Sequence, residues 1–232
     1  MRYVKPFFLS VLLGLALCPW LCALAPDYAH APQMVSLLHW ARMPVRVCVV
    51  MDSAATPERE RSALAGFGEW VQATAGAIRY QLVSDPARAD IVVTFDLEPT
   101  VPGHPGAVGH TDLRHEGPVL ARADMTLATA GVSPDELTQT AAHEFGHALG
   151  INGHSDGPDD LMSPDTMRLI RPDGTPLPAP HRAVTARDLN TLWLCYPSLR
   201  PGASPPQPAV VPASHIVIKH KQSKSTKHHK NQ

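Results

Sequence analysis

The chain has 232 residues, of which 44% are hydrophobic and 18% are charged, and its formal net charge is −1. This length and composition allow one globular domain with a hydrophobic core, together with tails. Between residues 26 and 200 there is no lysine, and 21 acidic residues outnumber 13 arginines. Nothing in this region resembles a basic nucleic-acid-binding surface, so we expect no nucleic-acid partner.

The first 25 residues have the pattern of a secretory signal peptide. Arg2 and Lys5 precede an apolar run that starts at Phe7, and an alanine-leucine-alanine pattern ends at Ala25. The apolar run is nearly long enough to span a membrane, so an uncleaved anchor is the alternative. We expect residues 1–25 to be removed and the protein to be secreted, to an extracellular or periplasmic location.

The next segments predict an α+β (α/β-like) domain over residues 44–199, preceded by a short N-terminal linker over residues 26–43. β-branched or alternating runs predict strands, and helical spacing behind capping residues predicts helices. In chain order the expected elements are a strand at 44–51, a helix at 56–76, strands at 77–84 and 89–97, a loop at 98–117, a strand at 119–128, and helices at 133–150 and 184–197. The strand at 119–128 is expected at the edge of the sheet.

From residue 200 onward the composition changes to a proline-rich linker followed by a basic tail. The tail holds five lysines and no acidic residue. Such a segment is typical of an extended, unpacked chain end, and we expect residues 200–232 to be disordered. The positive charge could also bind an anionic surface.

Two cysteines, Cys48 and Cys195, remain once the signal peptide is removed. In an oxidising compartment such a pair predicts one disulfide, and two buried thiols are the alternative. A bridge closing so long a loop would stabilise the fold by about 3–5 kcal/mol.

The run HEFGH, residues 143–147, contains the candidate metal-binding and catalytic residues. His143 and His147 are four residues apart in a predicted helix, so their side chains leave the same face. Two imidazoles in this arrangement can bind one zinc ion at about 2.0–2.1 Å. Glu144 projects beside that face, where a carboxylate could take a proton from a water activated by the metal. A catalytic zinc site needs a third protein ligand and one open position.

The third ligand has to come from the segment after the helix. No glutamate follows Glu144 in the chain, so a glutamate from a later helix is excluded. A sharp turn after the second histidine is the alternative. Gly150 can adopt the positive φ that such a turn requires, and His154 follows it. Asp156 is the competing third ligand, since carboxylates also bind zinc.

The segment from His143 to Met162 resembles the zinc signature of the metzincin metalloproteases, H-E-x-x-H-x-x-G-x-x-H followed by a methionine turn. The runs HEFGHALG and GHSDGPDDLMSP are especially similar to the matrixin branch, the peptidase M10 type. One departure is that the signature places its third histidine at Gly153, whereas His154 comes one residue later. The spacing from His154 to Met162 matches the family, which indicates a bulge at Asn152 and Gly153.

The resemblance implies a metzincin fold, with a twisted mixed β-sheet, an active-site helix and a C-terminal helix. It implies that the three histidines hold one catalytic zinc ion and that Glu144 acts as general base. Met162 would form a hydrophobic floor beneath the metal, and edge strand 119–127 would bind an extended polypeptide substrate. The expected function is a secreted, monomeric zinc-dependent endopeptidase.

Other features leave alternatives open. Matrixins often carry a structural zinc or calcium ion in the loop region where His104, His110, Asp112 and His115 cluster, although the spacing here differs. The substrate pocket is expected to be walled by residues 165–184. The alternative function is a zinc-containing binding module with weak or no catalysis, attached to the cell envelope by its basic tail. A secreted cell-wall amidase is a further option.

Overall fold

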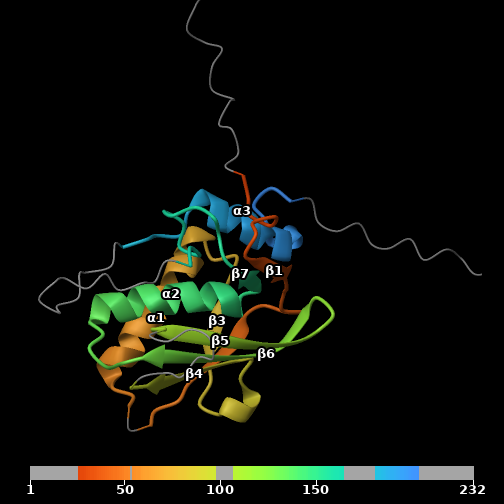
Figure 1. The fold of residues 1–232 in the computed structure, drawn as a ribbon. Coiled ribbons are helices and arrows are strands. Elements are labelled where there is room, and N and C mark those ends of the chain that lie inside the picture. Colours follow the sequence, from red (N-terminus) through yellow and green to blue (C-terminus); the bar gives the residue numbers. More distant parts are fainter. Residues whose placement is uncertain (1–25, 53, 98–106, 165–180, 204–232) are drawn as a thin grey trace, which may run out of the picture.

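The computed structural model describes residues 26–52, 54–97, 107–164 and 181–203, and its main feature is a β-sheet with helices packed on it (Figure 1). The predicted signal peptide, the tail from residue 204 and most of the predicted pocket wall lie outside these ranges. Within the described ranges, no helix is long and apolar enough to cross a membrane.

Five strands form the main sheet, in the order β3, β2, β4, β6, β5. Their bounds are Val45–Val49 for β2, Tyr80–Leu82 for β3, Ile91–Asp96 for β4, Gly109–Glu116 for β5 and Val119–Ala128 for β6. The first four strands in this order run parallel, whereas β5 runs antiparallel to β6. The apolar residues of β4 are mostly buried, as is typical of a parallel strand inside a sheet. The mixed sheet confirms the predicted α+β class.

The predicted edge position of residues 119–128 is wrong. β6 lies inside the sheet, between β4 and β5, and the two edge strands are β3 and β5. β5 and β6 form a hairpin whose turn contains Gly117 at a φ of +55°. Residues 109–116 are polar and rich in histidine, so their composition is that of a loop. Backbone pairing with β6 makes them a strand nevertheless.

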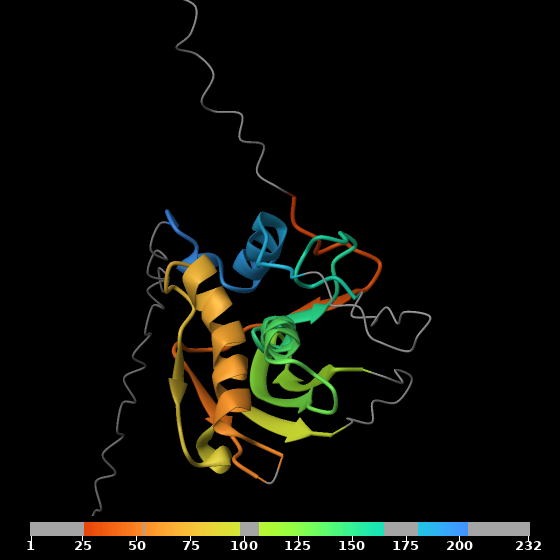
Figure 2. The same cartoon turned by 90° about the vertical axis from the view of Figure 1, so that its left-hand side faces the viewer.

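α1 (Pro57–Ala73) and α2 (Pro134–Ala148) pack against each other on one face of this sheet (Figure 2). Both helices begin where their capping residues predict. Thr56 caps α1 with its side chain, and Ser133 forms a capping box with Glu136 at the start of α2. The described part of the chain also holds two short 3₁₀ helices, Pro86–Arg88 and Pro197–Leu199.

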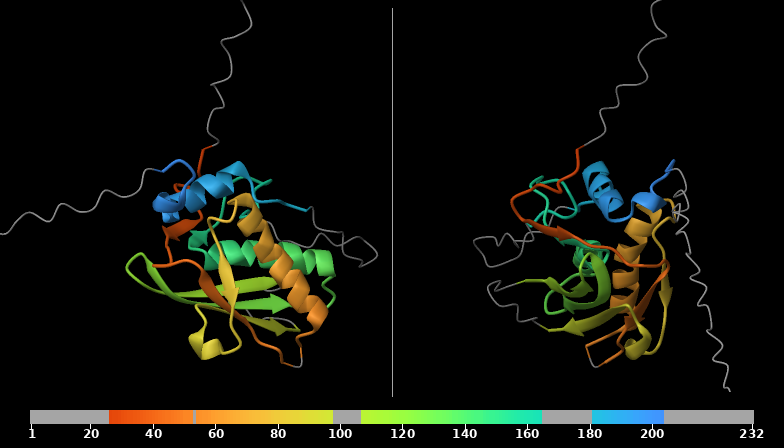
Figure 3. Two further views of the ribbon diagram at one scale, coloured as in Figure 1. Left: turned by 180° about the vertical axis from the view of Figure 1, so that it is seen from behind. Right: turned by 90° about the vertical axis from the view of Figure 1, so that its right-hand side faces the viewer.

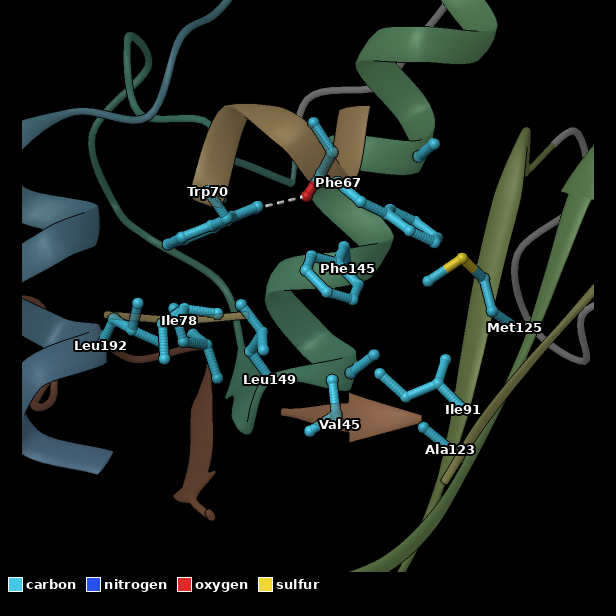
Figure 4. Close-up of a cluster of buried hydrophobic side chains, with 14 of the residues drawn as sticks. Val45, Phe67, Trp70, Ile78, Ile91, Ala123, Met125, Phe145, Leu149 and Leu192 are labelled. Carbon is cyan, nitrogen blue, oxygen red and sulfur yellow. Dashed lines mark hydrogen bonds between the residues drawn. The ribbon is translucent and has the colours of Figure 1, made fainter. Parts of the chain in front are cut away.

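The hydrophobic core lies between these two helices and the sheet (Figure 4). Phe67 of α1 stacks on Phe145 of α2, with the ring centroids 4.2 Å apart. Trp70 Nε1 donates a hydrogen bond of 2.8 Å to a backbone carbonyl of α2, drawn as the dashed line in Figure 4. Gly66 lets the helix backbones approach, because a Cβ atom there would lie 2.6 Å from a backbone nitrogen of α2. This packing fixes α2, which carries the HEFGH run, against the sheet.

The segment at residues 26–43, predicted as a linker, instead packs into the domain. Its strand β1 (Met34–Leu37) pairs with β7 (Ile151–Gly153) in a separate two-stranded antiparallel sheet near α3 (Ala186–Cys195) (Figure 3). Tyr28 is only 2% exposed. The strand is short and its partner is distant in sequence, so no local pattern reveals it. α3 matches the predicted C-terminal helix.

The predicted disulfide between Cys48 and Cys195 is wrong, because both cysteines are free and buried. Val47 of β2 belongs to the main core, and side chains alternate along a strand, so Cys48 points to the opposite face of the sheet. There it packs with Ala89 and Val92. Cys195 belongs to the main core. The sheet therefore separates the two thiols.

Candidate active site

His143 and His147 project from one face of α2. The Nδ1 of His143 donates to the Leu161 carbonyl oxygen at 2.8 Å, and the Nδ1 of His147 donates to the Ile151 carbonyl oxygen at 2.8 Å. Because a carbonyl can only accept, each neutral ring carries its hydrogen on Nδ1 and a lone pair on Nε2. The two Nε2 atoms lie 3.2 Å apart. Two lone pairs at this distance repel each other unless a cation lies between them.

His154 joins these two histidines, although it comes one residue later than the metzincin signature places it. The ligand nitrogens of the three histidines all lie within 4.8 Å of one another. The ring of His154 stands 4.9 Å from the ring of His147 and 5.3 Å from the ring of His143, centroid to centroid. The additional residue before His154 therefore does not keep its ring from the other two.

The protonation state of His143 and His147 suits a metal. Burial lowers the pKa of His143 well below its usual value and lowers the pKa of His147 to about 4. The neutral imidazole is the form that binds metal ions. Two nitrogens bound to one zinc ion with tetrahedral geometry lie about 3.4 Å apart, close to the 3.2 Å between the Nε2 atoms. The three donors fit one zinc ion and leave a fourth position for water or substrate.

Glu144 lies against the edge strand β5. Thr111 Oγ1 donates to Glu144 Oε2 at 2.7 Å. Gly109 makes room for this side chain, because a Cβ atom at Gly109 would lie 2.8 Å from Glu144 Cγ. Burial raises the pKa of the Glu144 carboxyl to about 7, although the hydrogen bond from Thr111 acts in the opposite direction. A carboxyl group with a pKa near neutrality can both accept and release a proton at physiological pH.

Met162 is fully buried beneath α2. A Cβ atom on Gly146 would overlap Met162 Sδ, so glycine at this position lets the methionine reach the helix between its two histidines. The Met162 carbonyl oxygen accepts a hydrogen bond of 2.8 Å from the backbone N–H of Ser155. The turn therefore closes directly behind His154, under the histidine cluster.

Asp188 of α3 anchors this turn, a role that the helix-capping pattern alone does not reveal. Its buried carboxylate accepts hydrogen bonds from the backbone N–H groups of Leu161 at 3.0 Å and Met162 at 3.3 Å. It also accepts from the hydroxyl of Tyr28 at 2.8 Å. Asp188 thereby joins α3, the methionine turn and the N-terminal segment.

Asp156, the competing third ligand, lies outside the histidine cluster. Its side chain is 57% exposed and pairs with Arg187 Nη2 at 2.6 Å. Arg187 Nη1 also pairs with Asp160 at 2.8 Å, and Asp160 accepts from the hydroxyl of Ser155, the residue after His154. Asp156 therefore belongs to the charged network that supports the loop after His154.

The described residues contain no second cluster of three metal-binding side chains. His110 Nε2 lies 3.0 Å from Asp112 Oδ1 on β5. His115 Nδ1 donates instead to the Gly117 carbonyl oxygen at 2.8 Å. His104 lies outside the described residues. The second structural ion stays a prediction without support from this part of the chain.

A helix bearing H-E-x-x-H, a third histidine after a returning strand and a buried methionine turn define a metallopeptidase site of the metzincin class. The family model described as Matrixin, of the peptidase M10 type, matches residues 40–179. The chain therefore belongs to the matrixin family, whose members are zinc-dependent metallopeptidases. A comparison with curated proteins found no significant match.

Proposed function

We propose that the protein is a secreted zinc-dependent endopeptidase that cleaves extended polypeptides. The observation that carries the proposal is the convergence of His143, His147 and His154 on one point, with Glu144 next to the first of them. The signal-peptide pattern of residues 1–25 supports secretion to an extracellular or periplasmic location. The basic tail could then hold the enzyme at an anionic surface.

The edge strand β5 offers a place for the substrate. Among the described strands, β5 has β6 on one side and no neighbour on the other. Thr111 of β5 also contacts Glu144. A peptide that pairs with the outer edge of β5 would run alongside the glutamate. Because such pairing uses backbone groups and requires no chain end, we expect cleavage at internal peptide bonds.

The chemistry divides between the metal and this chain's side chains. A bound zinc ion supplies a Lewis acid that polarises the scissile carbonyl and lowers the pKa of water. Glu144 then accepts the proton of the attacking water and passes it to the leaving amine. Its pKa of about 7 suits both steps. Thr111 binds Oε2 of the carboxylate, which leaves Oε1 for proton transfer.

The alternative function, a zinc-containing binding module without catalysis, rests on the shifted position of His154 in the sequence. In the structure His154 lies beside the other two histidines. The described residues therefore offer no specific observation that favours the binding module over the peptidase.

The test replaces Glu144 with glutamine, which keeps the shape of the side chain and removes the base. We expect Glu144→Gln to retain zinc and to hydrolyse a quenched fluorescent peptide library roughly 10²–10⁴-fold more slowly than the unaltered protein. Glu58→Gln, in the exposed first turn of α1, is the matched control and should leave the rate unchanged. Unaltered hydrolysis by zinc-loaded Glu144→Gln would refute the role of Glu144. Zinc-loaded protein that cleaves no peptide would favour the binding module.

A further inference from the structure

The N-terminal part of the domain holds the segment that delivers His154. β7 ends at Gly153, one residue before His154, and pairs antiparallel with β1 (Met34–Leu37). The backbone N–H of His154 itself donates to the Gln33 carbonyl oxygen at 3.2 Å. The third histidine is therefore bonded directly to the chain that precedes β1.

Two more hydrogen bonds fix the rest of this segment. The backbone N–H of Leu38 donates to the Gly150 carbonyl oxygen at 2.8 Å, where the chain leaves α2. The side-chain amide of Asn152 donates to the hydroxyl of Ser36 at 3.0 Å. The whole path from the end of α2 to His154 thus follows residues 33–38.

The two strands approach so closely that glycine is required on the β7 side. Gly153 has a φ of +142°, and a Cβ atom there would lie 2.5 Å from the Gln33 carbonyl oxygen and 2.6 Å from Met34 Cα. Gly150 has a φ of +113°, and a Cβ atom there would overlap the carbonyl oxygen of Leu38. These neighbours are backbone atoms, which cannot rotate away as a flexible side chain can. A larger residue at Gly150 or Gly153 would therefore push the two segments apart.

The irregularity in this pairing falls next to His154. Met34 pairs with Gly153 and Ser36 pairs with Asn152, so two steps along β1 match one step along β7. Val35, the residue between them, is 76% exposed. A bulge of this kind increases the local twist of a strand pair. The bulge predicted at Asn152 and Gly153 is wrong, because these two residues are consecutive in the pairing and the unmatched residue is Val35 of β1.

We infer that residues 33–38 are a positioning element of the metal site. They keep the His154 ring beside the other two histidines despite the additional residue before it. The zinc affinity of the three histidines therefore depends on β1 being paired with β7. This inference rests on the metal site of the proposed function but not on peptidase activity. Zinc binding at this site is then determined by the N-terminal segment as well as by the histidine motif.

The test measures the zinc affinity of the full chain by competition with a chromophoric chelator. Zinc is the only metal present, and no peptide is added. Gly153→Ala should weaken zinc binding roughly 10–100-fold, the range found when groups that orient metal ligands are removed. Gly76→Ala is the matched control. Gly76 also has a positive φ, +79°, but a Cβ atom there meets nothing within 4 Å. Its affinity should stay within about twofold of the unaltered protein, since it lies outside the metal site.

A double-mutant cycle separates positioning from general damage to the fold. If Gly153→Ala acts through His154, it should cause no further loss of affinity in a His154→Ala background. Unchanged zinc binding by Gly153→Ala, or an equal loss with and without His154, would overturn the inference. If Gly153→Ala does not fold, Ser36→Ala replaces it in the same cycle, since it removes only the bond to Asn152. It should weaken zinc binding measurably, and only while His154 is present.

Discussion

Thr111 Oγ1 on β5 donates a hydrogen bond of 2.7 Å to Oε2 of Glu144 on α2. This bond connects the edge of the sheet to the glutamate of the zinc motif. Gly109, two residues earlier and on the same face of β5, gives the glutamate side chain its space. The position of the proposed general base therefore depends on the strand along which we propose that the substrate binds.

Replacing Thr111 with valine keeps the shape of the side chain and removes this hydrogen bond. We expect kcat to fall roughly tenfold with KM little changed, because a hydrogen bond to a charged group contributes about 1.5–3 kcal/mol and part of that is regained from water. Thr111→Ser should restore most of the rate. Steady-state peptide hydrolysis measures kcat and KM of the two variants. A valine variant as active as the unaltered protein would contradict the positioning role of Thr111.

The crossing of α1 and α2 gives a stability prediction with an internal control. Gly66→Ala should destabilise the domain by about 1–3 kcal/mol, since the added methyl group meets the backbone of α2. Gly68, in the same helix, has nothing within 4 Å of a Cβ atom. Gly68→Ala should therefore stabilise by about 0.5–1 kcal/mol through helix propensity. Urea unfolding of both variants measures this, and equal effects would contradict the close packing at Gly66.

The lowered pKa of Asp90 makes the free energy of unfolding depend on pH. Its carboxylate receives hydrogen bonds from Arg46 Nη2 at 2.6 Å and Arg46 Nε at 3.1 Å. Burial raises the pKa of Asp90, but the bonds and charge of Arg46 outweigh this and lower the pKa overall. A lowered pKa stabilises the fold above the unfolded-state pKa of about 3.9, and this contribution is lost as pH falls through the folded-state pKa.

Asp90→Asn should therefore cost most at neutral pH, about 1–3 kcal/mol, because the substitution breaks a partly buried charged pair. The difference from the unaltered protein should shrink as the pH falls from about 5 to 2, where the unaltered carboxylate takes up its proton. Unfolding free energies measured across this range test the prediction. A difference that does not vary with pH would contradict it.

Asp188 connects α3 to the methionine turn, so we expect a change at Asp188 to affect both stability and zinc binding. Leu161 donates to one carboxylate oxygen of Asp188 and Met162 to the other. In Asp188→Asn one of these oxygens becomes an N–H donor that faces a backbone N–H group, so we expect a loss of about 1–3 kcal/mol of stability and weaker zinc binding. Glu58→Gln, in the exposed first turn of α1, is the control. Thermal unfolding with and without zinc compares the two, and equal effects would count against the anchoring role.

Features with local causes could be predicted from the sequence. Thr56 marks the start of α1, and Ser133 with Glu136 marks the start of α2, because capping acts within one turn of helix. The shared face of His143 and His147 follows from their spacing in the same way. The structure places all of these as expected.

Features that depend on distant pairing could not be predicted. The polar residues 109–116 become the edge strand β5 only because β6 pairs with them. Residues 34–37 become a strand only because β7 returns beside them. The separation of Cys48 from Cys195 depends on which hydrophobic cluster each side chain enters, and that is a property of tertiary packing.

The most direct measurement is a crystal structure of the zinc-loaded protein, with anomalous scattering recorded at the zinc absorption edge. We predict one peak, bonded at about 2.0–2.1 Å to Nε2 of His143, to Nε2 of His147 and to a ring nitrogen of His154. A peak that His154 does not contact, or no peak among the three rings, would contradict the account.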